Sequence, residues 1–332
     1  MKLASVFSSH MVFAHSQPIR IFGTGTGTAQ ITFAGATKTV ISENENWMVE
    51  FEPMDCGGPY TLTFCENGQA IDFDDIYVGK VFLFSGQSNM AFLTKSAENA
   101  LEFCESNDKL RLFSPDRSFG DDYFKAADGW VVAEKDTVKE WSALAYFAGN
   151  MLAKEKDVAV GILVSYQGGS VIESWVPQGW FEEHGINIPL KSKGTGHYDG
   201  EFAVFNGDGV LYNDLLTQII PFALSAVVWY QGESDTFGEE SVTYGKELSL
   251  LIDRWREDFM APALPFVIVQ IADYDVRNDK FWKAVQRSQF DIQFTKEKVS
   301  TVISADVCQS NDIHPTKKYA LAQRIVKLLR YM

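Results

Sequence analysis

The sequence contains 332 residues, which at roughly 150 residues per domain predicts about two domains and excludes a small disulfide-stapled scaffold. Hydrophobic residues make up 46% and charged residues 22%, a balance typical of a globular protein and not of a disordered chain. Lys and Arg total 29 against 44 Asp and Glu, and the resulting net charge of -15 disfavours nucleic acid or an anionic membrane surface as a partner.

The N-terminus lacks the apolar core of a secretory signal, and no stretch approaches the ~20 apolar residues of a membrane span. We therefore expect a cytoplasmic protein from the chain as given, or a secreted one if a signal has been removed. The four cysteines fit neither a zinc site nor a dense disulfide framework, so reduced and mostly buried thiols are expected at Cys56, Cys65, Cys104 and Cys308.

Residues 1–78 are predicted to form an N-terminal β-sandwich domain. Short segments of alternating polarity, separated by Gly or Asn turns, predict strands at 18–23, 30–34, 37–42, 47–51, 60–64 and 71–74. The Gly-Thr repeat at 23–28 contains no Lys and precedes no helix, so it is interpreted as a turn between strands and not as a phosphate loop.

Residues 79–332 are predicted to form an α/β domain. Continuous apolar runs predict strands at 81–85, 158–165, 226–230, 265–270 and 302–305, and amphipathic runs predict helices at 142–154, 212–222, 244–259, 280–294 and from Pro315 onward. This alternation indicates a doubly wound parallel sheet with right-handed crossovers. Ligands bind such sheets at the carboxyl ends of the strands, so the residues after each strand are the candidates for chemistry.

The first of these strands ends in Ser85-Gly86-Gln87-Ser88-Asn89-Met90. A serine in a tight strand-to-helix turn presents its Oγ at the sheet edge and turns its N–H toward the same space, as a nucleophile with half an oxyanion hole requires. The Gly-x-Ser-x-Gly elbow is absent, because Met90 occupies the place of its second Gly. A serine that only caps a helix is the alternative for Ser88.

Two further strand ends carry groups that can donate hydrogen bonds to an oxyanion. Gly168 and Gly169 follow the strand at 158–165, and their N–H groups can approach a ligand closely unless they form an ordinary turn. After the strand at 226–230, the Gln231 amide is a candidate third donor, and Glu233 a brace for the loop.

The general base is identified by elimination among five histidines. His10 and His15 lie in the β-rich part, while His184 and His197 lie in a polar segment. His314 follows the last predicted strand, where an adjacent carboxylate can orient its ring. A surface histidine before a helix is the alternative.

Taken together, these segments resemble the SGNH hydrolases, and more closely their sialate O-acetylesterase branch, which includes acetylxylan esterase relatives. The matching motifs are GQSNM at 86–90, GGS with IESW at 168–175, WYQGES at 229–234 and DIHP at 312–315, with further similarity in the N-terminal part at 7–13, 18–21 and 57–62. The resemblance therefore covers nearly the whole chain.

The resemblance implies a carbohydrate O-acetylesterase with a flavodoxin-like three-layer α/β/α domain. Its substrate would be an O-acetylated sialic acid or another acetylated saccharide, and no cofactor or metal is implied. Ser88 would be the nucleophile, His314 the base, and the N–H groups of Ser88 and Gly168 or Gly169 with the Gln231 amide the oxyanion hole. Residues expected to contact substrate are Gln87, Asn89, Glu173, Trp175 and Glu233.

One position departs from the pattern of the family. SGNH enzymes commonly carry Asp three residues before the His, where this chain has Asn311, and its carboxylate is Asp312, two residues before His314. Asp312 is predicted to orient His314 by a different loop path. Asn311 or a backbone carbonyl is the alternative, and would leave a Ser-His dyad.

The segment 176–209 contains several aromatic residues without clear periodicity, and we interpret it as a candidate substrate wall. A packed surface loop is the alternative. A polysaccharide acetylesterase such as an acetylxylan esterase is the alternative enzyme. A non-catalytic sugar-binding protein is a third hypothesis, which the set of Ser88, Gln231 and His314 argues against.

Overall fold

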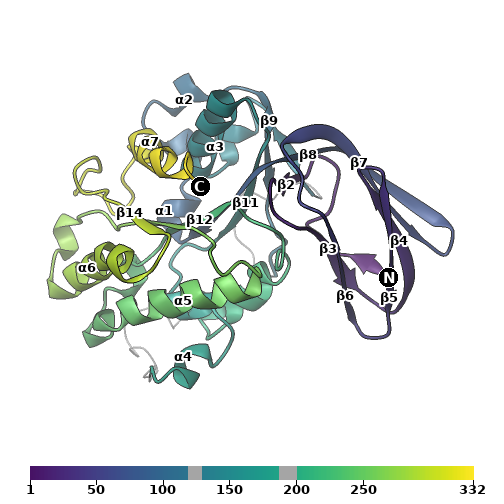
Figure 1. The fold of residues 1–332 in the computed structure, drawn as a ribbon. Coiled ribbons are helices and arrows are strands. Elements are labelled where there is room, and N and C mark those ends of the chain that lie inside the picture. The colour runs from purple at the N-terminus through teal and green to yellow at the C-terminus, as the bar shows by residue number, and fades with distance from the viewer. Residues whose placement is uncertain (119–128, 187–199) are drawn as a thin grey trace.

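The computed structural model describes residues 1–118, 129–186 and 200–332. A β-rich N-terminal part packs beside a larger α/β part, and the two share one strand (Figure 1). Among the described residues, no helix is long and apolar enough to cross a membrane.

The N-terminal part contains two sheets. A three-stranded antiparallel sheet is formed by β1 (Lys2–Leu3), β3 (Ile19–Thr24) and β6 (Asn46–Phe51). The other strands join the first half of β8 (Gln69–Gly86), and they are β2 (Val12–Ala14), β4 (Gly27–Phe33), β5 (Ala36–Ser42) and β7 (Gly57–Glu66). Aromatic side chains pack between the sheets, as in the stacked pair Trp47 and Phe64, whose ring centroids lie 6.0 Å apart.

The division expected at residues 78 and 79 falls inside a single strand. The early part of β8 pairs with β7, and its later part is the central strand of the α/β part. Two predicted strands, at 71–74 and 81–85, are therefore one continuous element. Alternating polarity gives way to a fully buried run near Val81 because the strand leaves a half-exposed sheet and enters one covered on both faces.

The large sheet of the α/β part has the order β10-β9-β11-β8-β12-β13-β14. All its neighbours pair in parallel except β10, which is antiparallel to β9. The strands are β9 (Asn107–Phe113), β10 (Val131–Ala133), β11 (Val160–Tyr166), β12 (Ala226–Tyr230), β13 (Phe266–Val269) and β14 (Val299–Val302). The sequence patterns do not predict β9 and β10, because β9 begins with polar residues and β10 is only three residues long.

Helices cover both faces of this sheet, as expected (Figure 1). On one face α3 (Ala143–Lys156) packs on α7 (Lys318–Leu329), and on the other α5 (Tyr244–Asp258) packs on α6 (Lys280–Thr295). The short helices are α1 (Ser88–Ala91), α2 (Ala100–Phe103) and α4 (Trp180–Glu183). Single helical turns lie at Thr94–Ser96, Val138–Glu140, Ile172–Trp175, Gly200–Val204, Tyr212–Leu216, Glu233–Asp235, Glu239–Val242 and Asp275–Arg277.

Two predicted helices differ from the structure. The helix expected at 212–222 is a π-type turn at Tyr212–Leu216 followed by turns, and Pro221 has no N–H with which to continue a helix. The last helix begins at Lys318 and not at Pro315. The cysteines are free, as expected, but only Cys104 and Cys308 are buried, while Cys65 is half-buried and Cys56 exposed.

Candidate active site

Strand register brings three of the motifs together at the carboxyl edge of the sheet. Gly86, the last residue of β8, lies opposite Tyr166 of β11 and Tyr230 of β12. The loops that follow these three residues therefore begin side by side at the carboxyl edge of the sheet. Backbone hydrogen bonds extend the alignment by one residue, from the Gln167 N–H to the Gly86 carbonyl and from the Gln87 N–H to the Tyr230 carbonyl.

The turn that presents Ser88 depends on glycine at position 86. Its φ of 140° lies in the region that favours glycine, and a Cβ there would lie 2.0 Å from the Tyr230 carbonyl oxygen. The chain turns sharply at Gly86, and α1 begins at Ser88. The serine thus stands at the first helical position, with its N–H at the helix N-terminus.

Ser88 and His314 are hydrogen-bonded across the sheet edge, with 2.8 Å between Oγ and Nε2. Two strands, β12 and β13, separate β8 from β14, so the loop after β14 crosses their ends to bring His314 back to Ser88. Burial is the main cause that lowers the pKa of His314, the charge of Lys318 lowers it further, and Asp312 opposes them. A lowered pKa keeps the imidazole neutral near pH 7, the form that accepts a proton from a serine hydroxyl.

Asp312 contacts His314 through the backbone. Its Oδ1 accepts the His314 N–H at 2.8 Å, and Nδ1 of the His314 ring has no hydrogen-bond partner within the described part of the chain. This geometry does not support the predicted orientation of the ring by the Asp312 carboxylate. It shows a Ser-His pair on a loop that Asp312 braces. The alternative residue Asn311 is exposed.

Backbone N–H groups for an oxyanion are present at two strand ends. Within the described residues, the N–H groups of Ser88, Gly168 and Gly169 donate no hydrogen bond. Gly169 has a φ of 72°, and a Cβ there would lie 2.6 Å from the Phe202 ring. Asn206 Nδ2 donates to the Gly169 carbonyl at 2.9 Å and steadies this turn.

Gln231 does not offer its amide to an oxyanion in this structure. Its Nε2 donates to the Ser170 carbonyl at 2.9 Å and also to the Asp235 carboxylate. Tyr244 Oη in turn donates to its Oε1. Both amide protons are therefore engaged, and the fully buried Gln231 ties the GGS turn to the loop after β12.

Three of the residues expected to contact substrate, Gln87, Asn89 and Glu233, are buried and stabilise the loops at this edge of the sheet. Gln87 Oε1 accepts the N–H groups of Gly232 and Ser234. Asn89 Nδ2 donates to Glu233 Oε1 at 2.6 Å. The three side chains are at most 4% exposed and are engaged inside the protein, so direct contact with a sugar is not supported.

The other two such residues, Glu173 and Trp175, are also buried. Trp175 Nε1 donates to Ser170 Oγ, and its ring packs edge-on against Trp229.

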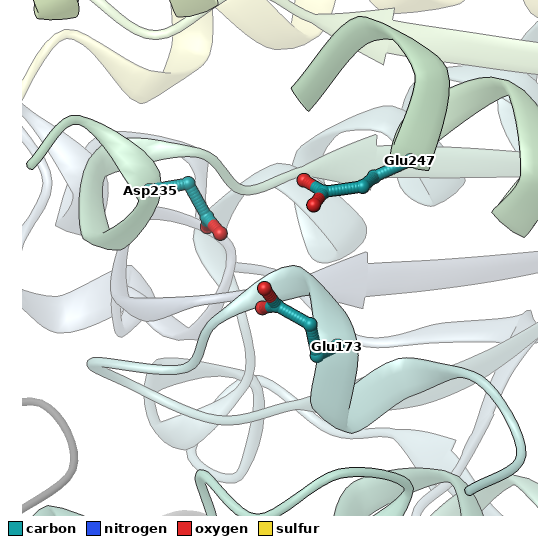
Figure 2. A group of neighbouring side chains, drawn as sticks. All are labelled: Glu173, Asp235 and Glu247. Carbon is teal, nitrogen blue, oxygen red and sulfur yellow. The ribbon is translucent and has the colours of Figure 1, made fainter. Parts of the chain in front are cut away.

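Glu173 lies beside Asp235 and Glu247, and one carboxylate oxygen of each of the three lies within 4.8 Å of the others (Figure 2). Carboxylate oxygens of this kind could hold a hard cation such as Mg²⁺ or Ca²⁺. Asp235 Oδ1 also accepts the Ile172 N–H, which joins the loops after β11 and β12.

The candidate substrate wall at 176–209 is only partly described. Phe181 and Phe205 are buried, and His184 packs on the Trp180 ring with 4.0 Å between centroids. Residues 187–199, which include His197, lie outside the described residues. The role of this segment stays a prediction.

Sequence reasoning missed Lys318, whose fully buried Nζ donates to Asn89 Oδ1 at 2.6 Å. A signal was available. Leu321, Ala322, Ile325 and Leu329 form the apolar stripe of α7, and Lys318 lies on the same stripe by helical spacing. A lysine on the apolar face of a helix must have its charge balanced inside the fold.

Comparison with known proteins gives a consistent result. A family profile described as carbohydrate esterase, sialic acid-specific acetylesterase matches residues 78–327. The sialate O-acetylesterases of Pongo abelii and Homo sapiens are each 25% identical over 92% of this chain. The chain spans about 65% of the length of these two relatives.

Two solved structures share the fold. A carbohydrate acetylesterase from Xanthomonas citri superposes with a TM-score of 0.85 at 26% identity, covering 99% of this chain and 74% of that one. A protein from Arabidopsis thaliana superposes with a TM-score of 0.50 at 19% identity, covering 76% of this chain and 97% of the other. The large mixed α/β fold is thus shared with a known carbohydrate acetylesterase.

Proposed function

Because the chain belongs to the family of carbohydrate esterases described as sialic acid-specific acetylesterases, we propose that it releases acetate from O-acetylated sugars, with O-acetylated sialic acid as its substrate. The observation that carries the proposal is the 2.8 Å hydrogen bond between Ser88 Oγ and His314 Nε2. A serine paired with a neutral imidazole is an activated nucleophile.

In the proposed reaction, His314 Nε2 takes the proton of Ser88 Oγ as this oxygen attacks the acetyl carbonyl carbon. The N–H groups of Ser88 and of Gly168 or Gly169 stabilise the oxyanion. When the tetrahedral intermediate collapses, the sugar oxygen leaves with the proton from His314, and acetyl-Ser88 remains. His314 then removes a proton from water, the water oxygen attacks the acetyl carbon, and acetate leaves as Ser88 recovers its proton.

We assign this chemistry to residues 79–332 and regard residues 1–78 as an N-terminal β-sandwich domain. The contacts between the two N-terminal sheets support this assignment, as in Phe33 of β4 against Phe51 of β6. The family profile begins at residue 78, which also supports it.

The sugar is assigned from the relatives. The two curated relatives carry the name sialate O-acetylesterase, whereas the Xanthomonas citri protein is described more broadly as a carbohydrate acetylesterase. Acetate release from O-acetylated sialosides and acetylated xylo-oligosaccharides, measured side by side, tests the assignment. A clear preference for the xylo-oligosaccharides would replace sialic acid with a plant polysaccharide and leave the mechanism intact.

The mechanism is tested by Ser88→Ala. We expect acetate release from p-nitrophenyl acetate to fall by several orders of magnitude, on the order of 10⁶-fold in a comparable serine hydrolase. Ser96→Ala, at an exposed serine close in sequence, is the matched control and should keep wild-type turnover. Activity of Ser88→Ala within tenfold of wild type would refute the serine mechanism.

A further inference from the structure

Lys318 is a buried cation close to the Ser88–His314 pair. The residue is fully buried, and its ammonium lies 4.8 Å from the Phe92 ring centroid and 5.4 Å from that of Tyr230. Among the described residues, Nζ donates a single hydrogen bond, to Asn89 Oδ1. Desolvation of an ammonium costs free energy, so an ordinary packing role does not account for a lysine here.

Asn89 connects Lys318 to the loop that carries His314. Its Oδ1 faces the Lys318 ammonium, while its Nδ2 donates to Glu233 Oε1 and, at 2.9 Å, to the Ile313 carbonyl. A flipped amide would place NH₂ against the ammonium and oxygen against two acceptors, so its orientation is determined. Because Asn89 follows Ser88 and Ile313 precedes His314, the amide joins the nucleophile to the base.

The charge of Lys318 also acts on the base. Burial lowers the pKa of Lys318 to about 8, against the opposing effects of Cys308, Glu233 and Asp312, so the ammonium is mostly protonated at neutral pH. A positive charge disfavours the imidazolium form, and after burial it is the next largest cause that lowers the pKa of His314. Asp312 acts in the opposite direction.

We propose that Lys318 is a positioning residue for the Ser88–His314 pair, holding the His314 loop to α1 through Asn89. The inference rests on the proposed esterase mechanism. Lys318 touches no reacting atom. Its effect is exerted on the distance between Oγ and Nε2 and on the protonation of His314.

The test is Lys318→Met, which keeps the length of the side chain and removes the charge. The variant also removes a positive charge from the surroundings of the buried Glu233. Because burial raises the pKa of Glu233, this carboxyl can take up a proton in the variant and become neutral. We expect kcat for p-nitrophenyl acetate to fall about tenfold to a hundredfold, the order of loss caused by a small misplacement of a catalytic group. KM should stay within twofold of wild type.

The pH profile separates positioning from mere structural support. The base works as neutral imidazole, so the acid limb of kcat/KM follows the pKa of His314. Removing a neighbouring positive charge raises that pKa, and the acid limb of Lys318→Met should move to higher pH. Lys327→Met, at an exposed lysine of the same helix, is the matched control and should leave both kcat and the acid limb unchanged.

The proposal is overturned if folded Lys318→Met keeps wild-type kcat and an unmoved acid limb while Ser88→Ala is inactive. An active Ser88→Ala would instead refute the esterase mechanism. If Lys318→Met does not fold, Asn89→Ala decides, because it removes the acceptor for Lys318 and both donors without adding a charge. Its kcat should also fall about tenfold to a hundredfold, and wild-type kcat would overturn the proposal. If neither variant folds, the pKa of His314 in the wild-type protein is measured by NMR, and a value at or above the ordinary 6.5 overturns the proposal.

Discussion

At the scale of single residues, Asp312 holds the backbone of His314 and not its ring. An asparagine oxygen can accept the same N–H, so we expect Asp312→Asn to lower turnover by about tenfold or less, far below the roughly 10⁴-fold loss when a triad Asp becomes Asn. Asp312→Ala removes the acceptor and should lose more. Steady-state kinetics of both variants measure this, and a 10⁴-fold loss in Asp312→Asn would show that the carboxylate reaches Nδ1 in the working enzyme.

The buried carboxylates of Glu173, Asp235 and Glu247 bear on the expected independence from metal (Figure 2). The proposed mechanism uses a serine and a histidine and needs no Lewis acid. Exhaustive chelation should therefore leave acetate release unchanged. Loss of activity with EDTA, and its return with Mg²⁺ or Ca²⁺ in wild type but not in Glu247→Gln, would show that the cluster holds a required cation.

At the scale of elements, the active edge depends on the path of β8 between β11 and β12. Gly86→Ala places a methyl group against the Tyr230 carbonyl at a backbone φ that already disfavours alanine. We expect a large loss of folded protein, measured as soluble yield and thermal unfolding midpoint. Gly35→Ala is a matched control with φ of 82° and no atom within 4 Å of the added Cβ, so it carries only the backbone strain of about 1–3 kcal/mol. Equal effects of the two substitutions would mean that the packing at Gly86 is unimportant.

At the scale of the whole molecule, Arg20 links the N-terminal sheets to the α/β part. The buried guanidinium donates to the carbonyls of Phe259 and Met260, just after α5, and to Glu50 of β6. Because α5 returns to the amino edge of the sheet before β13, this contact lies at the edge opposite Ser88. Its loss should therefore act on stability and not on chemistry.

We expect Arg20→Met to lower the free energy of unfolding by about 1.5–3 kcal/mol, the order found for hydrogen bonds to charged groups, with kcat unchanged at 25 °C. Arg330→Met, which breaks the exposed pair with Glu155, should cost less than about 1 kcal/mol. Denaturant unfolding of both variants measures the difference. Similar losses would show that Arg20 does not couple the two parts.

Sequence patterns are enough to identify the segments that bear chemistry. Each buried strand is a short apolar run, and Ser88, Gly168 and Gln231 each follow one, so parallel pairing places all three at the carboxyl edge. Elimination among the histidines points to His314, since His10 and His15 lie in the β-rich N-terminal part and His184 and His197 in a polar segment. These inferences are local, because polarity patterns and turn residues report on their own neighbourhood.

The contacts of each of these side chains depend on how the whole chain folds. Ser88 and His314 are 226 residues apart, and the loop after β14 must cross two strand ends to join them. No local pattern specifies that path. Along this path, the Asp312 carboxylate accepts a hydrogen bond from a backbone N–H. Strand register places the Gln231 amide where it donates to the Ser170 carbonyl and the Asp235 carboxylate. The burial of Lys318 beside Asn89 has the same origin, because a charge is placed inside a protein only by partners that the folded chain brings to it.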